Sequence, residues 1–269
     1  MEIAMTGGRD WVRIARWVGA AGLVAVWVAL LVLQPDVIGK PFGVDAMAYH
    51  DASLSDPYTG PKIGLPGAYL YPPPFIQVLT PLRLLPWEIF IALWLALELV
   101  ALAWLVGPAL GLLVLAIPFV LAEVAIGNVH LFMAVALVLG LRLPSTWAFI
   151  GLTKPTVAVV GSWHLFRGEW RQAGIALVTT LGVIAISVLV GADLWAAWLE
   201  RMRGDTGTAG PAWMVSLAVR IVMALAIVWY AARRRRAIFL PVAAFLALPI
   251  PWAEGLTLLA AIPRLARIR

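Results

Sequence analysis

Residues Trp87–Val106 read WEIFIALWLALELVALAWLV, a run whose only charged side chains are Glu88 and Glu98. A helix of this length spans about 30 Å, the thickness of the hydrocarbon core of a bilayer. The whole chain of 269 residues is similarly apolar, with 63% hydrophobic and 13% charged residues and a mean hydropathy of +0.95. Soluble domains have roughly 45–50% apolar and about 25% charged residues. The sequence therefore predicts an all-α, polytopic transmembrane bundle. It excludes a soluble enzyme, a disordered chain and a nucleic-acid-binding module.

At about 20 residues per span, the chain has room for roughly eight to ten membrane helices in a single domain over residues 1–269. The net charge is +6, and the basic clusters all fall on one face of the expected arrangement. Because Lys and Arg stay on the cytoplasmic side, the N-terminus of this multi-pass protein is expected to be cytoplasmic. Helices are expected at 13–33, 87–106, 108–126, 129–141, 172–190 and 213–232, with an up-and-down pair within 237–269.

Arg142 and the cluster at 167–171 both have the charge of a cytoplasmic end, and only a short stretch separates them. One span between them would place one of the clusters outside. A hairpin of two short helices, 144–153 and 155–166, resolves this conflict and puts Lys154 at its apex. Each arm is about 16 Å long, roughly half the hydrocarbon core. Broken helices of this kind are tolerated where they face protein or a wet cavity.

Two extracytoplasmic loops are expected, at 34–86 and 191–212. The first contains ten prolines, a density that predicts turns and extended chain rather than a regular helix. Its apolar part at 75–85 is expected to lie in the membrane interface. The second loop has apolar residues at helical spacing, which predicts a short amphipathic helix on the outer surface. These residues are Leu194, Trp195, Trp198, Leu199 and Met202.

Ionisable residues inside spans cost about 2.5–3.5 kcal/mol at the membrane centre, so each of them needs a reason. Lys154 and Arg220 are cations of this kind, and both could bind a lipid-linked phosphate. Two structural alternatives stay open: a lysine that extends to the outer interface, and an arginine paired with Glu123 or Glu254. Glu98 is expected to be a buried helix–helix partner or a neutral acid. Glu123 is expected to pair with Lys154 or Arg220.

The first loop also offers carboxylates that could accept a proton from an attacking hydroxyl. Asp45 lies closest to the first span among the interior loop positions, although a solvated residue or turn cap is the commoner role for such a side chain. The other three are Asp36, Asp51 and Asp56. The chain has no cysteine, and its three histidines lack the spacing of a helical zinc site. A His/Asp metal site assembled across loops stays open. Neither a Gly-rich phosphate loop nor a GxSxG motif occurs.

Three segments of the first loop form a series: GVDAMAYHDA at 43–52, YLYPPPF at 69–75 and TPLRLLP at 80–86. This series resembles the first external loop of the GT-C membrane glycosyltransferases. Within that class it looks most like the family 87 enzymes of actinobacteria. Their loop has an Asp, a Tyr a few residues on, then Tyr-x-Tyr-Pro-Pro and Pro-Leu-x-x-Leu-Pro.

Later segments follow in the family's order. GNVH at 127–130 is similar to its Gly-Gln-x-Asn turn, and GLTKP at 151–155 to its Lys-Pro segment. The stretches 216–220 and 249–254 resemble two further segments, and in the second Glu254 stands where the family often has His. The chain is shorter than typical members of the family.

The resemblance implies a glycosyltransferase that moves a hexose, with mannose expected, from a polyprenyl-phosphate donor to a lipid or glycan acceptor with inversion. Asp45 is implied as the general base, and Lys154 and Arg220 as ligands of the donor phosphate. Substrate contacts are implied for Tyr49, His50, Tyr69, Tyr71, Asn128, His130, Trp252 and Glu254. The scheme needs no cofactor and leaves a divalent metal open. It places the active site on the extracytoplasmic face of a bacterial plasma membrane, with membrane lipids and no nucleic acid as partners.

Two other functions stay open. A transporter or flippase for a lipid-linked anionic substrate would use the same two cations, would not need Asp45, and would need a path to both faces. A catalytically inactive relative would have lost a substrate site with its short C-terminus. The enzyme hypothesis requires Asp45, Lys154 and Arg220 to line one cavity open to the outer leaflet.

Overall fold

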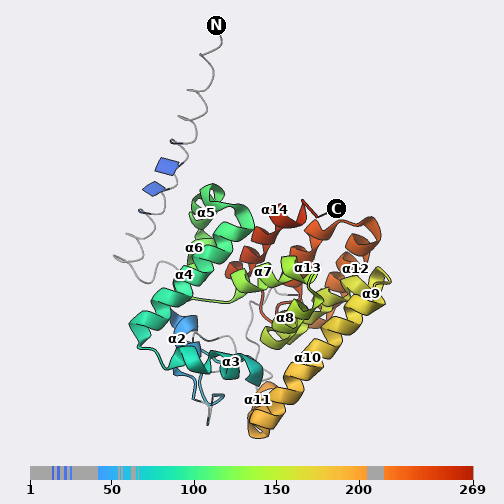
Figure 1. Ribbon diagram of the computed structural model, residues 1–269. Coiled ribbons are helices and arrows are strands. Elements are labelled where there is room, and N and C mark those ends of the chain that lie inside the picture. Colours follow the sequence, from blue (N-terminus) through green and yellow to red (C-terminus); the bar gives the residue numbers. More distant parts are fainter. Residues whose placement is uncertain are drawn as a thin grey trace.

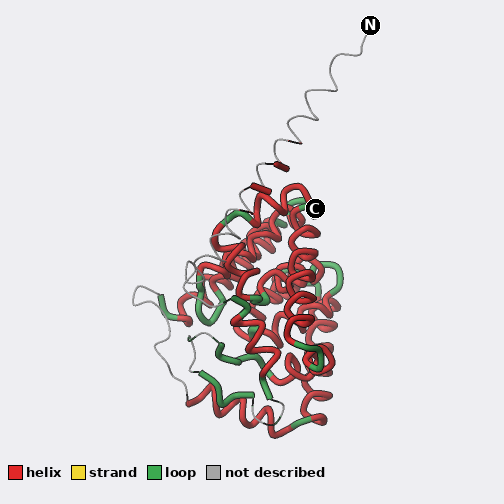
Figure 2. Tube along the Cα trace, turned by 90° about the vertical axis from the view of Figure 1, so that its left-hand side faces the viewer, coloured by secondary structure: helices red, strands yellow, loops and turns green. Residues whose placement is uncertain are grey.

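The computed structural model describes residues 42–53, 55, 57–61, 65, 67–204 and 215–268, with a few single positions between 14 and 25. Helices and their connections make up this described part, in which no strand occurs (Figure 1, Figure 2). The all-α class is therefore confirmed. The helix expected at 13–33 lies outside the described residues, apart from those single positions, and its bounds stay a prediction.

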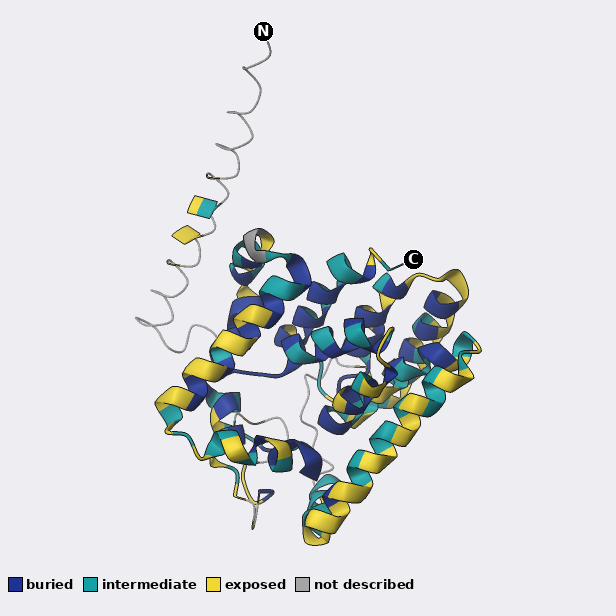
Figure 3. Ribbon diagram, in the orientation of Figure 1, coloured by how far each residue is buried: buried dark blue, intermediate teal, exposed yellow. Residues whose placement is uncertain are grey.

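Two of the described helices are long and apolar enough to cross a membrane, α4 (Trp87–Val106) and α10 (Trp170–Val190). The expected helix at 87–106 is confirmed residue for residue. The side of α10 that faces away from the bundle is exposed along its length (Figure 3), and Leu189 near its end is 87% exposed. An apolar face of this size needs lipid around it. The fold is that of a helical membrane protein, and the count of eight to ten spans stays a prediction.

The expected hairpin lies between these two helices and is confirmed. Its first arm is η2 (Pro144–Thr146) followed by α8 (Trp147–Thr153), and its second is η3 (Pro155–Ser162) followed by α9 (Trp163–Phe166). Lys154 joins the arms. The first arm packs against α10 on one side and α7 on the other (Figure 1). Both arms of the hairpin therefore have protein neighbours, although Phe149 and Leu165 are exposed.

The continuous helix expected at 108–126 is wrong, because the structure divides it into α5 (Pro108–Leu115) and α6 (Pro118–Ile126). Proline disfavours the helical conformation in the residue before it. Ile117 accordingly has an extended backbone, with φ −71° and ψ 126°.

α6 and α7 (His130–Gly140) meet at a bend of 103°, where two antiparallel spans were expected. They contain 9 and 11 residues, so each is only about 14–17 Å long. Gly127 makes the bend with a φ of +72°, and a Cβ there would lie 2.6 Å from the Cβ of Ala46. Glycine alone combines that conformation with so close an approach.

The expectation that the loop 34–86 lacks regular helix is wrong. It contains α2 (Val44–Asp51) and α3 (Pro73–Arg83). The prolines at the start of α3 occupy its first turn, where a backbone N–H has no helical acceptor in any case. Proline density therefore sets where α3 begins and does not prevent it.

The amphipathic helix expected in the second loop is confirmed as α11 (Ala192–Gly204). It is followed by α12 (Leu217–Arg234), which packs on the second arm of the hairpin. The rest of the chain consists of short helices separated by a break at 247–252: η4 (Ala237–Phe239), α13 (Leu240–Leu246), η5 (Ala253–Ala261) and α14 (Ile262–Leu265).

Candidate active site

Asp45 lies in the first turn of α2 and is half-buried. The helix is held in place by the residues on either side of it. Gly43 has a left-handed backbone (φ 67°), and its N–H donates to the carbonyl of Ala125 at the end of α6 over 2.7 Å. Ala46 is fully buried against Gly127. The α6–α7 bend therefore fixes the position of Asp45.

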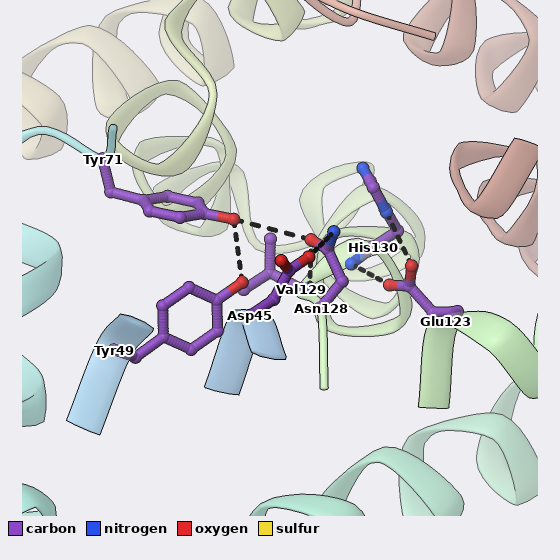
Figure 4. Close-up of polar contacts among 7 residues, drawn as sticks. All are labelled: Asp45, Tyr49, Tyr71, Glu123, Asn128, Val129 and His130. Atoms are coloured by element: carbon purple, nitrogen blue, oxygen red, sulfur yellow. Dashed lines mark hydrogen bonds and ion pairs between the residues drawn. The ribbon is translucent and has the colours of Figure 1, made fainter. Parts of the chain in front are cut away.

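Asn128, directly after the bend, turns its amide toward this carboxylate (Figure 4). Its Nδ2 donates to Oδ2 of Asp45 over 2.6 Å. Its Oδ1 accepts from the N–H of Val129 at 2.8 Å and from the hydroxyl of Tyr71 at a longer 3.5 Å. Because two donors face Oδ1, turning the amide round would lose all three contacts. Asn128 therefore presents an N–H to Asp45 in one orientation only.

Tyr49 and Tyr71 extend this network away from Asn128. Their hydroxyl oxygens are 2.9 Å apart, and their rings meet edge to face. Burial and, to a smaller extent, the negative charge of Asp45 raise the pKa of Tyr71 well above its ordinary value. Burial likewise raises the pKa of Tyr49. Both side chains are therefore neutral hydroxyls that can donate a hydrogen bond at any physiological pH.

Lys154 approaches the same tyrosine from the hairpin. Its Nζ lies 5.4 Å from the centre of the Tyr71 ring, within the range of a cation–π interaction. Lys154 is half-buried, between the last residue of α8 and the first of η3. The structure thus links a carboxylate and an ammonium, both predicted from the sequence, through one tyrosine: Asp45 by way of Asn128, and Lys154 over the ring.

Glu123 pairs with His130, and the expectation that it pairs with Lys154 or Arg220 is wrong. Its carboxylate accepts the backbone N–H of His130 at 2.7 Å and its Nδ1 at 2.9 Å. The bend at Gly127 brings the two residues together, and sequence spacing alone does not show this. Both side chains are buried.

An apolar cavity of about 850 Å³ begins beside Tyr71 and Lys154. It is lined by α3, α4, α7, η2, α8 and α10 and opens to the surface at exposed residues such as Val78 and Val100. Phe75, which stacks on Tyr71 with ring centres 4.5 Å apart, forms part of its wall, as does Thr153 next to Lys154. The polar cluster therefore lies at the margin of a chamber suited to a hydrocarbon chain.

Comparison with protein-family models gives a match to glycosyltransferase family 87 over residues 69–253, more than half of the chain. The chain belongs to glycosyltransferase family 87. No curated protein and no solved structure matches it. This family 87 protein is a membrane glycosyltransferase, so it has a sugar donor and an acceptor. The matched region includes Tyr71, Asn128 and Lys154. It begins after α2, so Asp45 lies outside it.

Tyr69 and His50, two predicted substrate contacts of the family 87 protein, differ in how their hydrogen-bonding groups are used. The hydroxyl of Tyr69 is buried and faces the backbone of Ile76 at the start of α3. Both ring nitrogens of His50 are engaged: Nδ1 lies 2.6 Å from the Asp51 carboxylate and Nε2 lies 3.0 Å from the carbonyl of Leu85. Since both partners accept, the imidazolium fits best. Burial lowers the pKa of His50, but these two bonds outweigh it and raise the pKa above its ordinary value.

Arg220 lies in the first turn of α12 and is only 4% exposed. Its Nε donates to the carbonyl of Val215 over 3.0 Å. Its Nη atoms donate to three carbonyls at the end of α13 and the start of the break that follows. Four of the five N–H groups of the guanidinium are thereby used. Arg220 supplies donors to the unpaired carbonyls of a helix end, and its phosphate-binding role stays a prediction.

The remaining predicted contacts lie at the start of η5. Trp252 is 40% exposed just before this helix, and Glu254 is buried in its first turn. Their roles toward a substrate stay predictions. In the part of the chain that the structure describes, no group of three His, Asp or Glu side chains is placed to hold a metal ion.

Proposed function

We propose that this family 87 protein transfers a hexose, with mannose expected, from a polyprenyl-phosphate donor to a lipid or glycan acceptor. The active site faces the extracytoplasmic side, and the reaction inverts the anomeric configuration. The observation that carries the proposal is the position of Tyr71. Its hydroxyl bonds the amide that holds Asp45, and its ring contacts Lys154.

The chemistry needs a base and a positive charge on opposite sides of the sugar. Asp45 takes the proton of the acceptor hydroxyl while the oxygen of that hydroxyl forms a bond to the anomeric carbon. The bond from that carbon to the phosphate oxygen breaks, and polyprenyl phosphate leaves with the electron pair. Lys154 stabilises the charge that grows on the phosphate. A single displacement of this kind inverts the anomeric centre, so a β-linked donor gives an α-glycoside.

The apolar cavity supports a lipid-linked donor over a water-soluble one. It is lined almost wholly by aliphatic and aromatic side chains, among them Leu79, Trp104 and Phe149. A nucleotide sugar would leave its charged groups unpaired against such walls. An isoprenoid chain would replace water there with favourable apolar contact. The phosphate would then lie at the margin of the cavity, beside Lys154.

The test is sugar transfer from radiolabelled polyprenyl-phosphate mannose in membranes that contain the protein. The wild type is compared with Asp45→Asn and with Asp193→Asn, an exposed carboxylate on α11. A positioned base contributes about 10²–10⁴-fold in rate, so transfer is expected to fall by that factor in Asp45→Asn alone. Digestion of the product with an α-specific glycosidase checks the inversion.

Three results would count against the proposal. Equal transfer by the wild type and Asp45→Asn would assign the base to another residue. Transfer from a different lipid-linked sugar in a panel would correct the donor. Movement of the labelled lipid across the bilayer without any transfer, unaffected by Asp45→Asn, would favour a flippase.

A further inference from the structure

The turn between α6 and α7 contains a second carboxylate–donor pair whose role the proposed mechanism does not use. Glu123 is completely buried, and its two carboxylate oxygens each accept one hydrogen bond from His130. Its backbone carbonyl accepts the N–H groups of Gly127 and Asn128, at 3.1 and 3.2 Å. One residue therefore binds both the start and the end of the segment 127–130.

The side chains of this pair share a proton between Nδ1 of His130 and Oε2 of Glu123, which are 2.9 Å apart. Nε2 is buried and has no partner among the described residues. A ring fixed at Nδ1 alone owes its orientation to Glu123, as the base of a triad owes its orientation to a carboxylate.

Asn128 is held on both sides by Glu123. Its own backbone N–H donates to the Glu123 carbonyl, and the backbone N–H of His130 donates to the Glu123 carboxylate. Its side chain is then directed at Asp45 over 2.6 Å. A rotation of this turn would move Nδ2 away from the carboxylate that the proposed mechanism uses as base.

We propose that Glu123 is a positioning residue: by clamping His130 it fixes the turn that holds the Asn128 amide against Asp45. This inference rests on the proposed function for its kinetic consequence only. A hydrogen bond donated to a carboxylate favours its ionised form, so loss of the clamp makes Asp45 a poorer base in acid. Glu123 itself does not touch the substrate.

Other titratable groups act on Asp45 and must be held constant. Tyr49 lies on the same helix and Tyr71 precedes α3. Glu98 on α4 interacts electrostatically with both Asp45 and Glu123. Glu98 is as buried as Glu123, but its carboxyl group lies beside the indole of Trp94 and makes no bond to the α6–α7 turn. Glu98→Gln is therefore the matched control for replacing a buried carboxyl group that lies outside the turn.

The experiment compares Glu123→Gln, Asn128→Ala, their double variant and Glu98→Gln. In Glu123→Gln, kcat for transfer is expected to fall about 10- to 100-fold, the loss of a hydrogen bond to a charged group. The KM for polyprenyl-phosphate mannose is expected to stay within about threefold, and the acidic limb of the pH–rate profile to move to higher pH. Because Glu123 acts through Asn128, the double variant is expected to be no worse than Asn128→Ala. Losses that multiply, an unmoved acidic limb, or an equal effect in Glu98→Gln would overturn the proposal.

A second measurement does not depend on catalysis. Infrared difference spectra between each protein and its Asp45→Asn counterpart follow the protonation of Asp45 directly. Its midpoint is expected to move in the same direction in Glu123→Gln and Asn128→Ala, and to stay in place in Glu98→Gln. If the wild type transfers no sugar, the proposed function fails while this titration still decides the positioning role. Should Glu123→Gln not fold, His130→Leu removes the side-chain bond of the clamp and keeps the backbone one. A smaller shift of the midpoint in the same direction is then expected, and an unmoved midpoint contradicts the proposal.

Discussion

The ammonium nitrogen of Lys154 lies 5.4 Å from the centre of the Tyr71 ring, and the same ring stacks on Phe75 in the wall of the apolar cavity. A charge, an aromatic face and a hydrocarbon chamber thus follow one another over a few ångströms. The order matches that of an amphiphile with an anionic head and a long apolar tail. It also connects the cavity to the hydroxyl network around Asp45.

Replacing Lys154 with Met keeps the length of the side chain and removes its charge. Loss of one preorganised group that stabilises a developing anion costs about 10²–10³-fold in kcat, and we expect a loss of this size in transfer from polyprenyl-phosphate mannose. Lys154→Arg keeps the charge and is expected to retain part of the rate. Arg203→Met, at an exposed position on α11, is the control. A Lys154→Met enzyme within a few-fold of wild type would remove Lys154 from the mechanism.

Filling the cavity should discriminate between donors by the length of their tails. Val135 on α7 lines the cavity, so Val135→Trp takes up part of the 850 Å³. We expect the KM to rise more for a long polyprenyl phosphate than for a short-chain analogue, measured in the same detergent. Val178→Trp, on the exposed face of α10, adds the same group outside the cavity. Equal effects of Val135→Trp on long and short donors would mean that the tail binds elsewhere.

Gly127→Ala tests the bend. An alanine there must adopt a left-handed backbone, and its Cβ would meet that of Ala46 at 2.6 Å. Strain and overpacking together cost about 2–5 kcal/mol, and we expect a lower unfolding temperature together with lost transfer. Gly174→Ala, in α10 with open space around it, should leave both unchanged. A Gly127→Ala protein of normal stability would show that the turn can relax.

Arg220→Met separates a structural from a catalytic role. Removing the guanidinium leaves buried carbonyls of the α13 end without donors, which we expect to cost about 3 kcal/mol or more. Lysine offers a single ammonium and cannot reach all four carbonyls, so Arg220→Lys is expected to be nearly as unstable. The measurement is thermal unfolding in lipid nanodiscs beside the transfer rate. A normal unfolding temperature with a strongly reduced kcat would instead favour phosphate binding.

His50 is expected to make stability depend on pH. Its pKa is raised in the folded protein, so its contribution is fully present below the unfolded value of about 6.5 and is lost as the pH rises through the folded value. The unfolding temperature of the wild type should therefore decline above pH 6.5, relative to that of His50→Gln. Parallel curves for the two proteins would mean that the Asp51 and Leu85 contacts do not hold a charge.

Apolar periodicity and positive charge predicted the fold well where one segment decides its own structure. The bounds of α4 and the hairpin with Lys154 at its apex both followed from the length of apolar runs and the side on which arginines lie. α2 and α3 were missed because proline was read as a helix breaker, whereas it begins α3. The division between α5 and α6 differs from the predicted continuous helix at 108–126 for the opposite reason. That prediction gave no weight to Pro118, which moves the backbone of Ile117 out of the helical conformation.

The site was predictable only in part. Asp45 and Lys154 were candidates from charge and position alone, and the family resemblance gave them roles and added Tyr71. The structure links Asp45 to the Tyr71 hydroxyl through Asn128 and places Lys154 over the ring. Contacts made across a turn or with backbone could not be read from the sequence. Glu123 meets His130 because Gly127 reverses the chain, and Arg220 binds carbonyls that every residue has. A pairing rule based on opposite charges therefore chose the wrong partner for Glu123.

The bend at Gly127 also has an electrostatic consequence. In a straight helix the N–H of His130 would bond a carbonyl one turn back, and no free donor would exist at that depth. Because the helix begins anew, the first N–H groups of α7 and the positive end of its dipole become available inside the bundle. The backbone N–H of His130 donates to Glu123, and the side-chain amide of Asn128, two residues earlier, donates to Asp45. An interrupted helix thus supplies hydrogen-bond donors to two acids at one place, the buried Glu123 and the half-buried Asp45.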